Sequence, residues 1–74
     1  MATKKAASIV LFALGEQIKK QRAEKGLSQT RLAEICGMEK SSLSKIESGL
    51  VNVSFLSLLK ISKALEVSLE ALVK

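Results

Sequence analysis

The 74-residue chain contains no histidine, proline, tryptophan or tyrosine, and its single cysteine is Cys36. With one cysteine and no histidine, the chain lacks the ligand spacings of zinc sites and cannot form an internal disulfide. It also has no glycine-rich phosphate loop and no candidate catalytic base with an identifiable partner. We therefore expect no metal, no cofactor, no small-molecule ligand and no enzymatic activity. Cys36 lies in an apolar stretch and is predicted to be a buried small hydrophobic residue.

Aromatic residues are almost absent, since Phe12 and Phe55 are the only two. Proteins that bind RNA or single-stranded DNA commonly stack bases on aromatic side chains, and this chain has too few for such a surface. The charge balance nevertheless favours a polyanion, because twelve Lys and Arg against seven Asp and Glu give a net charge of +5. Residues 1–37 contribute +4 of this excess and residues 38–74 contribute +1. Double-stranded DNA is therefore the predicted polyanion.

The length of the chain allows one domain, which we place at residues 8–74 after a flexible polar segment at residues 1–7. Domains of this size often gain stability from a disulfide, a metal or a partner subunit, and the composition leaves only the partner subunit. The apolar run at residues 8–14 is far too short to span a bilayer and continues into a charged amphipathic stretch. We therefore expect a cytoplasmic protein without a membrane partner.

Apolar residues recur at spacings of three and four, which predicts helices at residues 8–25, 29–36, 40–47, 55–65 and 69–73. Ser28, Ser54 and Ser68 are suitable N-terminal caps, while Gly26 and Gly37 are suitable stop signals. No segment alternates apolar and polar residues over a useful length, so no strand is predicted. The fold class expected from the sequence is all-α with five helices.

The segment at residues 29–48, QTRLAEICGMEKSSLSKIES, has the features of a helix-turn-helix motif. Such a motif needs a small residue where its two helices cross, a turn that tolerates positive φ, and apolar anchors on both helices. Ala33 and Gly37 meet the first two needs. The anchors are Leu32, Met38, Leu43 and Ile46. The combination favours a DNA-binding motif over a plain helical hairpin.

Three segments of the sequence resemble the lambda-repressor/Cro-like family, also called the XRE-type helix-turn-helix family. They are LGEQIKKQRAEKGLSQTRLAEICG, MEKSSLSKIESG and VSFLSLLKISKALEVSLEAL, and together they cover most of the chain from Leu14 to Val73. The resemblance implies a five-helix DNA-binding domain. Its third helix would enter the major groove, while its second would cross the DNA backbone.

The resemblance also implies which residues contact DNA. Lysine can donate to guanine, serine can bond several base edges or phosphate, and glutamine can pair with adenine. On the third helix, the residues that would read the bases, here called the reader residues, share one face opposite Leu43 and Ile46. Further contacts would come from the start of the second helix and from the loop after the third, where donors can hold a phosphate. The predicted DNA-binding residues are Gln29, Lys40, Ser41, Ser44, Lys45, Ser48 and Asn52. A solvated polar helix face and a simple turn-forming Asn are the structural alternatives for these positions.

Arg22 and Glu47 match a pair that forms an internal salt bridge in similar proteins, so Arg22 is not counted among the phosphate ligands. Two positions depart from the family pattern. Glu39 stands where relatives have a shorter capping residue, and Arg31 stands where a Glu would complete a capping box with Ser28. Both helix starts are therefore expected to be weakly capped.

The sequence also predicts a homodimer, built from the loop after the third helix and from the fourth and fifth helices. Apolar residues cover most of the circumference of the predicted helix at residues 55–65, more than one small core can bury. The predicted dimer interface residues are Val51, Val53, Phe55, Leu72 and Val73. Two-fold pairing would place two reader helices about 34 Å apart and call for a pseudo-palindromic operator.

The function predicted from the sequence is a homodimeric transcriptional regulator that binds a specific DNA sequence. Residues 51–67 are also similar to the small controller proteins of restriction-modification systems, although residues 39–42 lack the Arg and Tyr reader that many of those proteins have. The alternative is a protein-interaction module on the same fold, such as an antitoxin or an adaptor. Such a module would show a reader face without hydrogen-bond donors, whereas this chain keeps Lys40 and Lys45.

Overall fold

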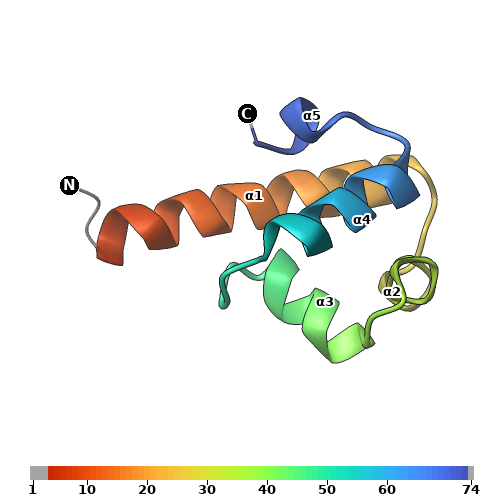
Figure 1. Ribbon diagram of the computed structural model, residues 1–74, viewed down its shortest axis with the longest axis horizontal. Helices are drawn as coiled ribbons and strands as arrows, with labels where there is room; N and C mark the ends of the chain where they lie inside the picture. Colours follow the sequence, from red (N-terminus) through yellow and green to blue (C-terminus); the bar gives the residue numbers. More distant parts are fainter. Residues whose placement is uncertain (1–3, 74) are drawn as a thin grey trace.

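The computed structural model describes residues 4–73, and the longest helix, α1 (Lys4–Glu24), runs along its long axis (Figure 1). The other helices are α2 (Gln29–Cys36), α3 (Lys40–Glu47), α4 (Phe55–Leu65) and α5 (Leu69–Val73). No strand occurs between residues 4 and 73. The predicted all-α class with five helices is therefore confirmed. No helix in this part of the chain is long and apolar enough to cross a membrane.

Serine side chains cap the N-termini of three helices, as the sequence predicts. The Ser28 Oγ accepts a hydrogen bond from the Arg31 N–H at 3.0 Å, and the Ser54 Oγ accepts one from the Ser57 N–H at 3.1 Å. The Ser68 Oγ accepts one from the Ala71 N–H at 3.2 Å. Each bond satisfies a first-turn N–H that has no partner within its own helix. By contrast, Glu39, the N-cap residue of α3, makes no side-chain hydrogen bond to the first turn, as expected from the length of that residue.

The start of α1 differs from the prediction. The helix begins at Lys4, four residues before the predicted start at residue 8, and residues 1–3 lie outside the described residues. The flexibility of residues 1–7 stays a prediction. Lys and Ala are among the best helix formers, and an existing helix adds further residues at little cost. Sequence reasoning placed the boundary too late because Lys4 and Lys5 are polar and basic and the segment carries no capping signal.

A single core holds the five helices together, and each helix contributes to it. Its fully buried side chains include Ile18 of α1, Leu32 of α2, Leu43 of α3, Ile61 of α4 and Leu72 of α5. Cys36 is also buried among these residues, as predicted. Leu72 was expected at a dimer interface, and this prediction is wrong, because the core of the protomer already covers the side chain completely.

Main-chain atoms of α1 and of the α3 C-terminus approach each other closely. A Cβ atom at Gly15 would lie 2.3 Å from the Glu47 carbonyl oxygen, and one at Gly49 would lie 2.8 Å from the Phe12 Cα. Gly49 also has a φ of +73°, a conformation that glycine adopts without strain. Two glycines thus let α3 dock directly on the backbone of α1.

Candidate nucleic-acid interface

The α2–α3 pair has the local geometry of a helix-turn-helix. Gly37 follows α2 with a φ of +68° and a ψ of +34°, and its left-handed conformation turns the chain away from the helix axis. The Met38 N–H then donates to the Ala33 carbonyl at 2.9 Å, which closes the turn. Leu32 and Leu43, one from each helix, are completely buried. The small residue, the turn glycine and the anchors therefore occupy the places that the sequence predicted for them.

The outer face of α3 is polar and open to solvent. Lys40, Ser41 and Lys45 are exposed and Ser44 is half-buried, whereas the opposite face buries Leu43, Ile46 and Glu47. Among the described side chains, neither Lys40 nor Lys45 takes part in an ion pair. The structure therefore brings the four predicted reader residues to one face and leaves both ammonium groups available to a ligand.

A shallow groove of about 400 Å³ lies beside this face, between α3 and the start of α4. Lys45 and Asn52 both line it, together with the serines Ser42, Ser54 and Ser57. Hydroxyl, amide and ammonium groups are the donors that commonly hold DNA phosphates. Ser48 is exposed in the cap that ends α3, so the structure places both loop residues of the predicted site near the reader face.

The Arg22 and Glu47 side chains form the internal ion pair that the resemblance implied. The Arg22 Nε donates to the Glu47 Oε2 at 2.8 Å and its Nη2 donates to the Oε1 at 3.0 Å, while its Nη1 donates to the Leu27 carbonyl at 3.0 Å. The Glu47 side chain is 1% exposed and that of Arg22 is 18% exposed. This fork-shaped contact ties α1 to the last residue of α3.

The Gln29 side chain makes a contact within the fold that sequence reasoning missed. Its Nε2 donates to the Glu47 Oε1 at 3.0 Å, so the first residue of α2 is bonded to the last residue of α3. The residue is half-buried, and its amide keeps a second N–H and a carbonyl oxygen for other partners. No spacing in the sequence indicates this contact, because it joins residues 18 positions apart through a fold-dependent crossing of two helices.

The residues predicted for a dimer interface divide into three kinds. Phe55 and Val73 are well exposed, and Val51 lies at the limit between exposed and half-buried. Val53 is half-buried and packs against the core of its own protomer. Leu72 is excluded by its burial, as described above. Phe55, Val73 and Val51 therefore remain on the surface.

Comparisons with known proteins agree with this geometry. The Helix-turn-helix family (HTH_3) matches residues 18–72. The HTH-type transcriptional regulator SinR of Bacillus subtilis is 47% identical over 60 residues, which are 80% of this chain and 54% of SinR. The chain thus spans about half the length of this relative.

Two solved structures are similar over most of the chain. One is the restriction-modification controller protein C.AhdI from Aeromonas hydrophila, with a TM-score of 0.82 and 35% identity over 84% of this chain and 94% of that one. The other is SinR, the master regulator for biofilm formation, in complex with DNA, with a TM-score of 0.78 and 45% identity over 82% of this chain and 98% of that one. The sequence match, the fold and the turn geometry agree that the chain belongs to the Helix-turn-helix family.

Proposed function

We propose that this protein is a transcriptional regulator that binds a specific sequence of double-stranded DNA as a homodimer. The observation that carries the proposal is the reader face of α3, where exposed Lys40, Ser41 and Lys45 lie opposite the buried anchors. The same helix-turn-helix occurs in SinR, whose structure was solved with DNA and whose identity to this chain is 45%. Of the relatives named above, SinR is a transcriptional regulator and C.AhdI is a restriction-modification controller protein.

In this proposal the contacts have two roles. Lys40, Ser41, Ser44 and Lys45 meet base edges in the major groove, where lysine and serine supply hydrogen-bond donors. Gln29 at the start of α2 and Ser48 and Asn52 after the C-terminus of α3 hold phosphates, which fixes the register of the protein on the duplex. The net charge of +5 adds affinity that does not depend on sequence.

Selection from a random duplex library tests the proposal. We expect enrichment of an approximate palindrome, because two reader helices related by a two-fold axis recognise two inverted half-sites. Failure of well-folded protein to enrich any sequence at moderate salt would contradict DNA recognition and favour the alternative of an antitoxin or adaptor.

Substitution of single lysines then locates the reader. Lys45→Ala should weaken binding to the selected site by about 1 to 3 kcal/mol and relax preference at one base position. The matched control is Lys60→Ala, which removes an exposed lysine from α4 and should change affinity little. Equal losses for Lys45→Ala on selected and random duplexes would show that Lys45 contacts phosphate rather than a base.

A further inference from the structure

The two longest uncharged stretches of the chain, residues 6–15 and 48–59, contrast with a composition that is 26% charged. The first forms the N-terminal half of α1, and the second forms the loop after α3 and the start of α4. The second lies beside this half of α1, and so does the last turn of α5: in Figure 1 the loop is below α1 and α5 is above it. We call this surface, made by residues 7–14, 50–56 and 73, the charge-free end.

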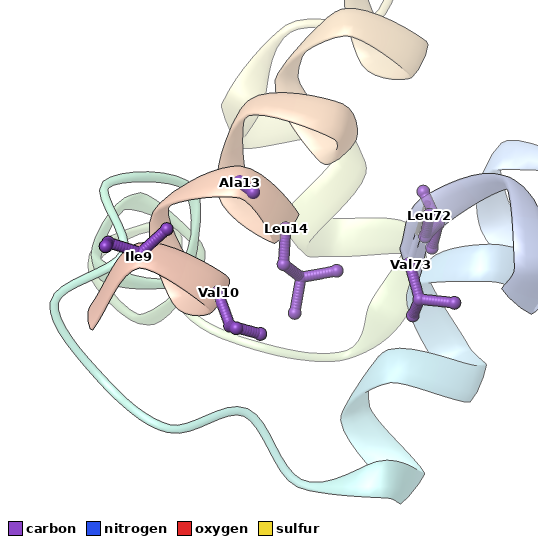
Figure 2. Close-up of a pocket in the computed structure, with 6 residues that line it drawn as sticks. All are labelled: Ile9, Val10, Ala13, Leu14, Leu72 and Val73. Carbon is purple, nitrogen blue, oxygen red and sulfur yellow. The ribbon is translucent and has the colours of Figure 1, made fainter. Parts of the chain in front are cut away.

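A groove of about 290 Å³ lies within the charge-free end, between α1 and α5 (Figure 2). Leu14 and Leu72 are buried at its base, and Ile9, Val10 and Val73 are exposed at its rim. Every side chain that lines it is apolar, so these side chains offer no hydrogen bond or charge to a polar ligand. Only an apolar surface complements such a groove.

Large apolar side chains also project from the charge-free end. Both phenylalanines of the chain are exposed, Phe12 by 58% and Phe55 by 67%, and Leu50 and Leu56 are exposed as well. Aromatic residues bury more area than other side chains when they are covered, so two exposed phenylalanines in a chain with no other aromatic residue mark a contact surface. The same end therefore carries both a hollow and projections.

We infer that a second copy of this chain covers the charge-free end, and that the N-terminal half of α1 forms one wall of the interface between the two copies. The inference rests on the proposed homodimer and names the element that builds it. Residues 4–17 precede the segment that the family model matches, so this wall lies outside the matched segment.

Charge favours a second copy as the occupant. Two molecules that each carry +5 repel one another across most of their surfaces, and a face formed by the uncharged residues 7–14, 50–56 and 73 brings no charged pair of these residues together. A two-fold interface also uses the same patch on both partners, so the patch must carry its own hollows and projections. The charge-free end carries both.

The available area also fits a dimer. Eight exposed apolar residues lie on this end, and each leaves on the order of 100 Å² in water, which together approaches the roughly 800 Å² that each partner of a specific complex buries. These residues are Ile9, Val10, Phe12, Leu50, Val51, Phe55, Leu56 and Val73.

A charge placed in the groove rim tests the inference in the full chain. Ile9→Glu should weaken dimerisation by at least about tenfold, because it buries an unpaired carboxylate at the interface. The matched control, Ile35→Glu, changes an exposed isoleucine of α2 that lies outside the charge-free end, and it should leave dimerisation unchanged. Sedimentation across micromolar concentrations would measure the mass against the 8.0 kDa of one chain. Circular dichroism would verify that both variants stay helical.

A fluorescent variant gives a direct measure of burial at the same position. The chain contains no tryptophan, so Ile9→Trp introduces a single indole. Its emission should shift to shorter wavelength over the concentration range in which the mass doubles. The emission of an Ile35→Trp control should not change with concentration. A concentration-independent spectrum at position 9 in a chain that dimerises would place the interface elsewhere.

These outcomes separate the inference from the proposed function. If the wild type dimerises and Ile9→Glu dimerises equally well, the α1 wall is refuted while the regulator stands. If Ile9→Glu is monomeric and the wild type enriches no duplex sequence, the interface stands and DNA recognition fails. A wild-type chain that stays at 8.0 kDa while selecting a single half-site would overturn the dimer, and the inference with it.

Discussion

Removing the Glu47 carboxylate is expected to destabilise the fold more than any other change of a charged side chain. Glu47→Ala leaves the partly buried Arg22 guanidinium without its two charge-assisted hydrogen bonds, and it also removes the acceptor of the Gln29 amide. Loss of one partner of a buried ion pair costs about 3 to 5 kcal/mol. Because the Arg22 side chain keeps 18% of its surface in water, we expect a value near the lower end of that range.

This loss is large for a chain of 74 residues. Small domains have unfolding free energies of about 0.05 to 0.15 kcal/mol per residue, so about 3 kcal/mol is a major part of the total. In domains of this size each kcal/mol lowers Tm by roughly 4 to 8 °C, so Glu47→Ala should melt at least about 12 °C below the wild type. Melting followed by circular dichroism measures this, at a fixed protein concentration because the proposed dimerisation would also raise Tm.

The chain supplies a matched control in the exposed pair of Arg31 and Glu34. Their charged atoms lie 3.3 Å apart, and both side chains are more than half exposed. Glu34→Ala should therefore cost no more than about 0.5 kcal/mol. Replacing both members of the buried pair, Arg22→Met with Glu47→Leu, should restore most of the lost stability because no charge then remains buried. If Glu47→Ala and Glu34→Ala cost the same, the argument from burial is wrong.

Three further predictions follow from packing, burial and charge. Gly15→Ala should lower the unfolding free energy by about 1 to 3 kcal/mol in denaturant titrations, because its new Cβ would lie 2.3 Å from a carbonyl oxygen of α3; unchanged stability would show that the helices separate easily. Burial raises the pKa of the Cys36 thiol, and the positive charge of Lys60 offsets only part of this rise. The thiol's contribution to stability is therefore complete below the pKa of the unfolded chain and is lost as pH rises through the pKa of the folded protein. Denaturant titrations from neutral to alkaline pH should therefore show a loss in the wild type that Cys36→Ala reduces, and identical curves would contradict it. Finally, the logarithm of the affinity for duplex DNA should fall linearly with the logarithm of the salt concentration. A binding titration in which the affinity does not change with salt would exclude phosphate contacts.

Helix starts and the turn were predictable because their causes are local. Ser28 and Ser54 cap their helices through bonds to residues three positions ahead, and Gly37 has the positive φ that its place after α2 requires. The end of α4 at Leu65 was also predicted, but Glu66, which follows it, has a φ of +58° without being a glycine. A left-handed glutamate carries no sequence signal; here the Val67 N–H donates to the Ser62 carbonyl at 3.0 Å and Val67 packs against the core.

Positions that depend on how helices cross were harder to predict. Leu72 and Val73 are neighbours in a helix of five residues, and the sequence cannot tell which of them faces the core in so short an element. The structure buries Leu72 and exposes Val73. The bond from Gln29 to Glu47 was missed for a related reason, because it depends on the crossing of α2 and α3.

The backbone contact at Gly15 and Gly49 has a consequence for how easily this protein can acquire a new target sequence. The orientation of α3 is set by main-chain atoms of α1 and by its buried face, and the exposed residues at positions 40, 41 and 45 contribute nothing to it. Those positions are therefore free to vary without refitting the scaffold. A library randomised at these three residues should yield mostly folded proteins with Tm values close to the wild type and with altered base preferences. Widespread unfolding in such a library would show that the reader face and the scaffold are not independent.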